Sequence, residues 1–291
     1  MTAGAAPRRR DFVGHGGIRL AADVWGAQSA PPLVLLHGGG QTRHAWDRTG
    51  PRLAALGWRV IAPDLRGHGT SGWSADGDYA LDLFAEDVRA IVARLDGRPV
   101  LVGASLGGLA SLLAAGEAPQ AAIRALVLVD VAHRPDPRGF RRIVAFMRGH
   151  PDGFADVGEA AAAVSAHLPH RPRRADPEGL RTNLRRHGGR WVWHWDPRMP
   201  DSFEGRMDPP GMAERLLDAA RHADVPTLLV RGGISDVVRA DVAEEFCARV
   251  PLARRVDVLG AGHMVAGDRN DHFLDAIVPF LETVGRTLLG D

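Results

Sequence analysis

Short apolar runs alternate with longer amphipathic stretches along most of the chain. Strands are predicted at residues 18–25, 32–36, 59–63, 100–103 and 125–129. The last four are continuous apolar runs, which are typical of strands buried on both faces. Helices are predicted between them at about 45–56, 81–95 and 106–116, and each is long enough to cross over a parallel sheet. The pattern therefore predicts an α/β fold.

The pattern changes after Asp130. Pro, Arg, Gly and His dominate to about residue 211, with helical pieces near 159–168 and 177–187 and no strand that the main sheet needs. Alternation resumes with helices near 213–222, 241–250 and 270–288 and strands at 227–231 and 255–259. We therefore expect a core domain of residues 1–130 and 213–291 and a lid of residues 131–212. The lid should lie over the carboxyl ends of the strands, where open α/β sheets bind ligands.

Composition narrows the possible partners. The chain has 291 residues, of which 45% are hydrophobic and 24% charged, so it can bury a large core. A formal net charge of +1 gives no argument for a nucleic-acid partner. No apolar run approaches the ~18 residues that would span a bilayer, so no membrane partner is expected. Residues 8–12 begin with three consecutive arginines that no apolar stretch follows, and we expect them to form a solvated tail.

Cys247 is the single cysteine, which excludes an intrachain disulfide and a cysteine zinc cluster. A reducing cytoplasm suits such a chain. We expect no metal, nucleotide or flavin cofactor, because no ligand cluster or phosphate loop appears in the right context. The expected partner is a small-molecule substrate, and the sequence does not indicate an oligomeric state.

Ser105 is the first candidate for chemistry. It stands in Gly-Ala-Ser-Leu-Gly-Gly between a predicted strand and a predicted helix. Small residues two positions before and after a serine allow a sharp, strained turn that holds the hydroxyl over the end of the sheet. A glycine-rich loop without chemistry would share the pattern, so the assignment depends on the residues that would activate the serine.

A serine hydroxyl needs a neighbouring base and a group that orients this base. His263 follows the strand predicted at 255–259, in a glycine-rich loop. Asp236 follows the strand predicted at 227–231, so that Ser, Asp and His occur in the expected chain order. Asp130 ends the strand at 125–129 and is the alternative acid. We expect His263 as the base and prefer Asp236 over Asp130 as the acid.

Negative charge that develops on a carbonyl oxygen must meet preorganised donors. The backbone amide of Leu106, at the start of the predicted helix, is one candidate. The other is Gly39 in the segment His-Gly-Gly-Gly at 37–40, with Gly38 and Gly40 as lesser candidates. A flexible structural turn is the alternative interpretation of this segment.

Together these motifs, with Asp-Leu-Arg-Gly-His-Gly-Thr-Ser at 64–71, resemble the α/β-hydrolase family over most of the chain outside the lid. The resemblance implies an α/β-hydrolase fold, in which helices flank a mostly parallel sheet and a mainly helical lid follows the sixth strand. It implies the site residues just described: Ser105, Asp236, His263, Gly39 and Leu106. Asp64 and His68 would shape the end of the sheet without taking part in catalysis.

The lid contributes a group of indoles. Trp191, Trp193 and Trp195 alternate with other residues, so that an extended backbone would place all three on one side. They would either line a substrate pocket or attach the lid to the core. His194, between two of them, is expected to be a hydrogen-bonded structural residue. Trp46 is a further candidate for the pocket wall, with helix packing as the alternative.

These features predict a serine hydrolase that cleaves a small-to-medium, largely apolar ester, thioester or lactone through an acyl-enzyme at Ser105. The same triad could instead cleave a carbon-carbon bond or form peracids in the manner of a cofactor-free haloperoxidase. A non-hydrolytic ligand receptor on this fold is the third possibility.

Overall fold

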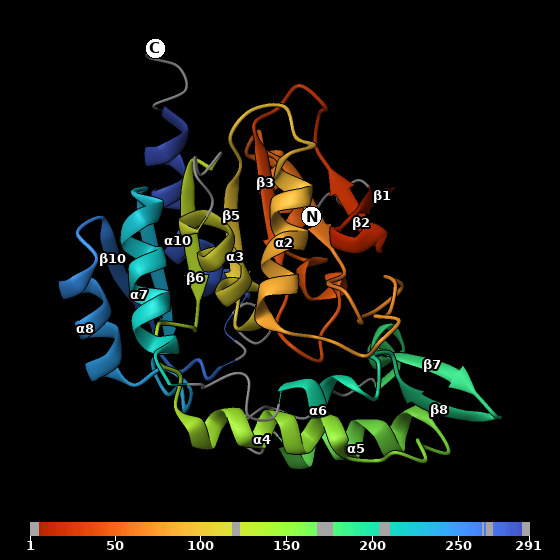
Figure 1. Cartoon of the computed structure of the whole chain (residues 1–291). Coiled ribbons are helices and arrows are strands. Elements are labelled where there is room, and N and C mark those ends of the chain that lie inside the picture. Colours follow the sequence, from red (N-terminus) through yellow and green to blue (C-terminus); the bar gives the residue numbers. More distant parts are fainter. Residues whose placement is uncertain are drawn as a thin grey trace.

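An eight-stranded sheet forms the centre of the molecule (Figure 1). The computed structural model describes residues 6–117, 123–167, 177–203, 210–263, 265 and 270–286. The strands, in their order across the sheet, are β1 (Arg8–Val13), β2 (Arg19–Trp25), β4 (Arg59–Pro63), β3 (Pro32–Leu36), β5 (Val100–Ala104), β6 (Ala125–Val129), β9 (Thr227–Gly232) and β10 (Ala253–Val258). All neighbours from β4 to β10 are parallel, whereas β2 is antiparallel to both of its neighbours. The predicted mostly parallel sheet is confirmed.

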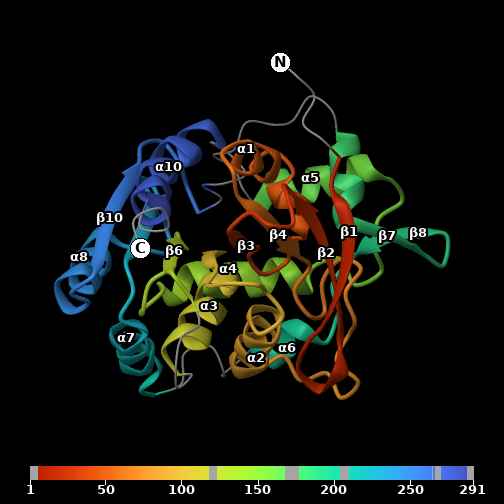
Figure 2. The ribbon, with the colours of Figure 1, turned by 90° about the horizontal axis from the view of Figure 1, so that it is seen from above.

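Helices cover both faces of this sheet (Figure 2). One face packs against α2 (Leu81–Val92), α3 (Leu106–Gly116), α7 (Met212–Ala223) and α8 (Ala240–Arg249). The other face packs against α1 (Gly50–Ala55) and α10 (Asn270–Arg286). Side chains of a strand point alternately to the two faces, so Leu33 and Leu35 of β3 pack on the second face and Val34 and Leu36 on the first. Burial on both faces explains why these strands are continuously apolar.

The amino-terminal segment differs from our expectation. Residues 8–12, predicted as a solvated tail, belong to β1, which pairs with β2 along its whole length. Phe12 is the reason, because its side chain is buried beneath the sheet at 1% exposure. The guanidinium of Arg10 lies 4.7 Å from the centre of the Phe12 ring. Exposed arginines on this edge strand discourage pairing with another chain. A short helical turn, η1 (His15–Gly17), connects β1 to β2.

We call residues 131–212 the lid segment, and its described elements lie across the carboxyl ends of the strands (Figure 1). The described elements of this segment are α4 (Pro137–Arg148), α5 (Val157–His167), η3 (Pro177–Asn183), β7 (Leu184–His187), β8 (Arg190–Trp193) and α6 (Met199–Phe203). α4 was not predicted. It begins at Asp136, whose side chain accepts a hydrogen bond from the amide of Arg138 at 2.8 Å, and Pro137 takes its first position.

The helix predicted at 177–187 is wrong in its second half. η3 ends at Asn183, and the following residues form β7, which pairs antiparallel with β8 in a separate two-stranded sheet. Gly188 and Gly189 connect the two strands with φ of 55° and 80°, which suits a tight hairpin turn. The predicted helix ends at Leu168 and Leu288 lie outside the described residues.

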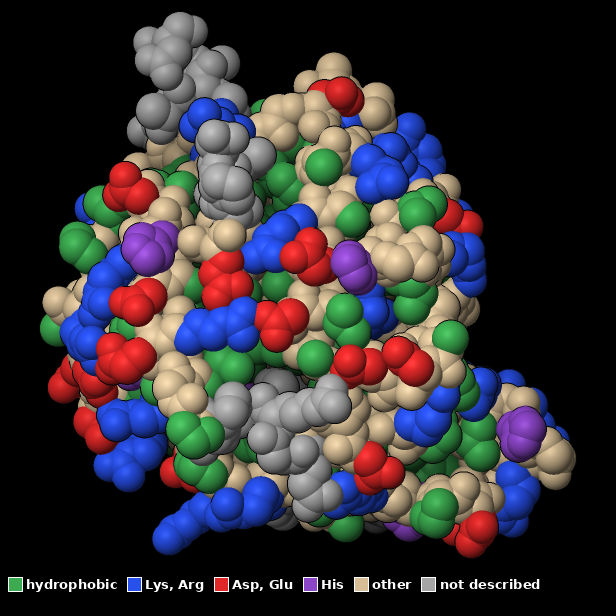
Figure 3. All heavy atoms as spheres, viewed as in Figure 1, with side chains coloured by type: hydrophobic (Ala, Val, Ile, Leu, Met, Phe, Trp, Pro, Cys, Tyr) green, Lys and Arg blue, Asp and Glu red, His purple; other side chains and the backbone are tan. Residues whose placement is uncertain are grey.

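Acidic and basic side chains are interspersed over the face seen in Figure 3, in keeping with the small net charge. In the described part of the chain, no helix combines the length and the apolar character needed to cross a bilayer.

Candidate active site

Ser105 lies at a sharp turn between β5 and α3. Its φ of 45° and ψ of −114° are rare for a residue with a side chain and indicate local backbone strain. Close backbone contacts enforce the turn: a Cβ on Gly103 would come within 2.5 Å of the carbonyl oxygen of Gly107. Only glycine fits there, which is why the nucleophile motif requires small residues around the serine.

The backbone of Ser105 is fixed to the neighbouring strand. Its amide donates to the carbonyl oxygen of Val129, the last residue of β6, at 3.1 Å. Asp130 follows Val129 directly and has φ of 48°, another unusual value for a residue with a side chain. The turn at Ser105 and the carboxylate of Asp130 therefore lie side by side at the carboxyl ends of two adjacent strands.

Asp130 holds the imidazole of His263. The Nδ1 atom of His263 lies 2.7 Å from Oδ2 of Asp130, whose side chain is fully buried. A carboxylate oxygen can only accept, so Nδ1 carries the hydrogen. Nε2 then carries none and, among the described residues, has no hydrogen-bond partner. Asp130 also accepts from the amide of Gly232 at 2.8 Å and from the hydroxyl of Ser235. Groups from the ends of three strands, β6, β9 and β10, thus meet at this one carboxylate.

Asp236 does not reach His263, and our preference for it as the orienting acid is corrected to Asp130. Its side chain is 56% exposed and pairs with Arg142 of α4. The physical reason is the loop after β9: Gly232 and Ser235 both turn toward Asp130, which leaves Asp236 one residue further along, facing the lid segment. The strand of Asp130 is also the direct neighbour of β5, whereas β9 is one strand more distant from Ser105.

The glycine loop (residues 37–40) follows β3 and passes beside Ser105. A Cβ on Gly38 would lie 3.4 Å from the Cβ of Ser105. The amide of Gly38 donates to Oε1 of Gln41 at 2.8 Å, and the amide of Gly40 donates to Nε2 of His68 at 3.1 Å. Of the three glycine amides, only that of Gly39 has no hydrogen-bond acceptor among the described residues.

His37 fixes the peptide group that carries this amide. Its Nδ1 donates to the carbonyl oxygen of Gly38 at 2.8 Å, and its Nε2 accepts from the amide of Leu65 at 2.9 Å. The carbonyl of Gly38 and the N–H of Gly39 belong to one planar trans peptide and point in opposite directions. Anchoring the carbonyl inside the loop therefore turns the N–H of Gly39 outward.

Leu106 supplies a second free amide. It is the first residue of α3, and the N–H groups of the first helical turn have no partner within the helix. The positive end of the helix dipole also favours an anion at this position. Gly39, Ser105 and Leu106 line the same cavity, so both amides and the hydroxyl lie around one space.

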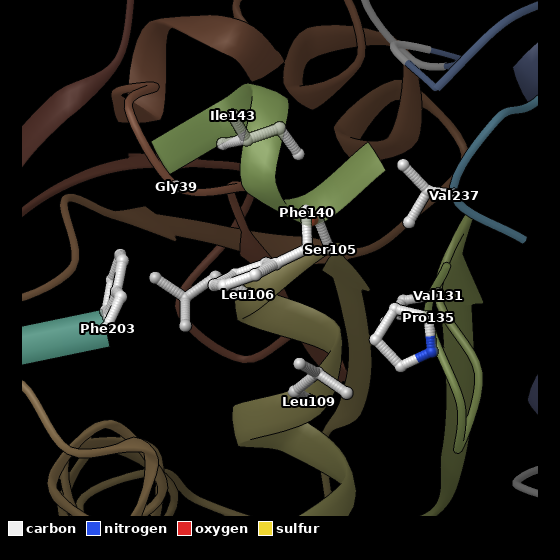
Figure 4. A pocket seen from close by; sticks show the side chains of 10 residues that line it. All are labelled: Gly39, Ser105, Leu106, Leu109, Val131, Pro135, Phe140, Ile143, Phe203 and Val237. Carbon is white, nitrogen blue, oxygen red and sulfur yellow. The ribbon is translucent and has the colours of Figure 1, made fainter. Parts of the chain in front are cut away.

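This cavity is small and apolar (Figure 4). Its volume is about 30 Å³, enough for very few water molecules. Figure 4 shows the side chains of the lid segment and the core facing one another across it. The lining residues beyond Gly39, Ser105 and Leu106 are Leu109, Val131, Pro135, Phe140, Ile143, Phe203 and Val237. Sequence reasoning missed Phe140 and Ile143, although their spacing in α4 is a helical signal.

The tryptophans proposed as pocket walls are not among the lining residues. Trp193 and Trp195 stack on each other, with ring centres 4.8 Å apart, and are buried in the packing between the lid segment and the core. Trp191 packs against the guanidinium groups of two lid arginines. Trp46 is buried on the opposite face of the sheet against Phe273. All four tryptophans therefore pack against other protein side chains and do not line the cavity.

Asp64 and His68, expected to be structural, are buried at the same end of the sheet. Asp64 forms an ion pair with Arg43 and accepts from the amides of Arg43 and Thr70, both at 2.8 Å. His68 donates from Nδ1 to the carbonyl oxygen of Arg66 at 2.9 Å, which leaves Nε2 for the amide of Gly40. The 64–71 segment therefore holds the glycine loop through the hydrogen bond between His68 and Gly40.

Oxygen and nitrogen atoms of Asp23, His44 and Asp47 lie close enough to suggest a cation site. The carboxylate of Asp23 is already bound by two arginines, at 3.0 Å from Nε of Arg9 and 3.1 Å from Nε of Arg43. Two positive charges lie against Asp23, the one buried carboxylate of these three residues, and oppose a further cation, so we assign no metal to them.

Residues 31–269 match the alpha/beta hydrolase fold family. The chain is 34% identical over 274 residues to the protein named Esterase Rv0045c of Mycobacterium tuberculosis, covering 91% of this chain and 87% of that one. It is 29% identical over 257 residues to a 3-hydroxybutyrate-oligomer hydrolase of Cupriavidus necator, covering 84% and 87%.

Solved structures give the same result. An alpha/beta hydrolase from Novosphingobium aromaticivorans superposes with a TM-score of 0.81 at 28% identity, covering 96% of this chain and 99% of that chain. A structure of the Mycobacterium tuberculosis esterase Rv0045c superposes with a TM-score of 0.75 at 30% identity, covering 96% and 93%. The chain, with its strained serine turn and its buried aspartate-histidine pair, belongs to the α/β-hydrolase superfamily.

Proposed function

We propose that this protein is a serine hydrolase that cleaves ester bonds through an acyl-enzyme at Ser105. His263 is the general base and Asp130 orients it. The amides of Gly39 and Leu106 bind the oxyanion. The observation that carries the proposal is the 2.7 Å hydrogen bond from His263 to the buried Asp130, next to the strained turn of Ser105.

The first half of the reaction forms the acyl-enzyme. Nε2 of His263 takes the proton of the Ser105 hydroxyl as the oxygen attacks the acyl carbon of the substrate. The negative charge that develops on the carbonyl oxygen is stabilised by the two amides, which are held in place before the substrate arrives. The tetrahedral intermediate collapses, the ester C–O bond breaks, and the leaving alkoxide takes the proton from His263.

The second half releases the acid. Water enters, gives a proton to Nε2 of His263 and attacks the acyl carbon, and the Ser105 oxygen leaves with that proton. In both halves the carboxylate of Asp130 stabilises the imidazolium that forms transiently. Its burial beneath the loop after β9 keeps water from competing for the Nδ1 hydrogen of His263.

The cavity supports a short, apolar acyl group. Its walls are aliphatic and aromatic side chains, and no charged side chain is among its lining residues. Such a lining favours an uncharged ester, thioester or lactone. Two relatives have names that also point to ester hydrolysis, the esterase of Mycobacterium tuberculosis and the 3-hydroxybutyrate-oligomer hydrolase.

Turnover of p-nitrophenyl esters tests the proposal. The wild-type protein should release p-nitrophenol from short acyl esters, and Ser105→Ala should lose this activity by at least about a thousand-fold. Stoichiometric ligand binding without release of p-nitrophenol would favour a receptor. Equal activity of the two proteins would contradict a nucleophilic Ser105, and product analysis separates ester hydrolysis from carbon-carbon bond cleavage and peracid formation.

A further inference from the structure

Three buried histidines run in a row from the core to the lid segment. His37 and His68 belong to the core, and His194 lies in the lid segment between β8 and α6. The ring centres are 5.0 Å apart for His37 and His68 and 5.9 Å apart for His68 and His194. All three side chains are nearly inaccessible to solvent. Burial lowers the pKa of each ring, that of His68 to about 3, so the rings are uncharged at neutral pH.

The hydrogen bonds of His194 connect the lid segment to two core loops. Its Nδ1 accepts from the amide of Gly69 at 2.7 Å, so that atom carries no hydrogen. The hydrogen of the uncharged ring is therefore on Nε2, which faces the carbonyl oxygen of Gly40 at 3.4 Å. One ring of the lid segment thus contacts the 64–71 segment and the glycine loop at once.

Gly40 is consequently held from two sides. From the core, Nε2 of His68 accepts its N–H at 3.1 Å, and from the lid segment His194 faces its carbonyl oxygen. Trp195 and Met147 also close over it, since each has a carbon 3.6 Å from where a Cβ of Gly40 would stand. Gly40 has φ of 72° and directly follows the residue whose amide faces the cavity.

We propose that His194 is a positioning residue, through which the docked lid segment fixes the glycine loop and hence the direction of the Gly39 amide. The lid segment then does more than cover the substrate, because the Gly39 amide reaches its working geometry only when the lid segment is docked. The effect on turnover rests on the proposed function, whereas the effect on the loop itself does not.

Amide hydrogen exchange and steady-state kinetics of His194→Phe test this inference together. Phenylalanine keeps the ring volume but removes both polar atoms. Exchange of the peptides that span residues 37–42 and 66–71 should become at least about ten-fold faster. The kcat for a p-nitrophenyl ester should fall about 10- to 100-fold with KM changed less than about two-fold, because a misplaced oxyanion donor weakens the transition state more than the ground state.

Two further variants complete the design. Phe154→Leu is the matched control. The ring centres of Phe154 and Trp193 lie 5.0 Å apart inside the lid segment, so this substitution loosens the packing of the lid segment but leaves the hydrogen bonds of His194 in place. At an equal loss of melting temperature it should leave exchange at 37–42 unchanged. His194→Asn offers an acceptor near the position of Nδ1 for the amide of Gly69, so exchange at 66–71 should be as slow as in the wild type. This variant replaces His194→Phe if the phenylalanine variant does not fold.

The result that overturns the inference is unchanged exchange at residues 37–42 in the His194 variants, whatever happens to turnover. Equal acceleration by Phe154→Leu would overturn it as well, since general loosening would then be the cause. A wild-type protein that hydrolyses no ester would refute the proposed function, while the exchange measurements would still decide the role of His194.

Discussion

His263 and Asp130 share a hydrogen bond of 2.7 Å, although 133 residues separate them in the chain. The carboxylate is inaccessible to solvent, and the imidazole is 14% exposed. One nitrogen of the ring therefore faces the protein interior and is held by the carboxylate. The other nitrogen, Nε2, has no hydrogen bond to a described residue, and the turn of Ser105 follows a strand that ends at the same edge of the sheet.

Asp130→Asn tests how much the orientation of the His263 ring by Asp130 contributes to turnover. An asparagine amide can donate to Nδ1 and would stabilise the wrong tautomer of His263, so kcat for an ester should fall about 10³- to 10⁴-fold. Asp236→Asn is the matched control, because it removes an exposed ion pair with Arg142 and should change kcat by less than about two-fold. Steady-state kinetics of both variants would contradict the assignment if Asp236→Asn showed the larger loss.

Phe203→Ala should shift the preference for acyl chain length. Phe203 of α6 lines the small cavity beside Ser105, and its removal opens space for an extended acyl group. Each added methylene that becomes buried is worth about 0.8 kcal/mol, or roughly four-fold in kcat/KM. A series of p-nitrophenyl esters from acetate to octanoate measures the shift. Trp191→Ala, outside the lining, should leave the profile unchanged, and a shift of the same size in that variant would refute the cavity as the acyl site.

Stability should fall as the pH drops below about 6.5, the ordinary pKa of histidine. The pKa of His68 is lowered to about 3 by burial, so between these values the unfolded chain binds a proton that the folded protein does not. Each such histidine costs about 1.4 kcal/mol of unfolding free energy per pH unit of acidification. Urea unfolding of the wild type and of His68→Gln between pH 6 and pH 4 measures this slope. The variant should show a slope smaller by about that amount, and equal slopes would show that His68 is protonated in the folded protein.

The edge strand β1 should contribute to global stability through Phe12. Phe12→Ala should lower the free energy of unfolding by about 3 kcal/mol, because it empties a fully buried site in the core. Val13→Ala, at the neighbouring position with 49% exposure, should cost less than about 0.5 kcal/mol. Chemical denaturation of both variants checks this, and similar small losses would place residues 8–13 outside the folded core.

The sheet could be predicted because its signal is local. The bounds of β3, β4 and β6 match the predicted runs, since a strand buried on both faces is almost continuously apolar. Arg59, the first residue of β4, is the one charged residue in these three strands. β1 escaped prediction because only one of its faces is covered, and its arginines outnumber the single residue, Phe12, that holds it in place.

The orienting acid could not be chosen from the sequence, because the choice depends on side-chain direction at the end of the sheet. Asp130 and Asp236 both follow strands that end at the same edge. The positive φ of Asp130 and the hydrogen bonds from Gly232 and Ser235 decide between them, and neither feature has a local sequence signal. Both aspartates satisfy the chain order Ser, Asp, His, whereas the adjacency of β6 to β5 favours Asp130.

The secondary structure of the lid segment was predicted least accurately, because α4, β7 and β8 were all missed. α4 carries an apolar face at 140, 143, 144 and 147, but the arginines between these positions hide its period. The hairpin of β7 and β8 depends on two successive glycines with positive φ, which also occur in ordinary loops. The part of the cavity wall that α4 supplies, Phe140 and Ile143, was therefore not predicted from the sequence.

The most direct test is covalent labelling of the folded protein with a fluorophosphonate, followed by peptide mapping. The wild type should carry one phosphonyl group on Ser105, and His263→Ala should be labelled at least about a hundred-fold more slowly because the hydroxyl has lost its base. No labelling of Ser105 in the folded wild type, or equally fast labelling of both proteins, would contradict a nucleophile activated by this histidine.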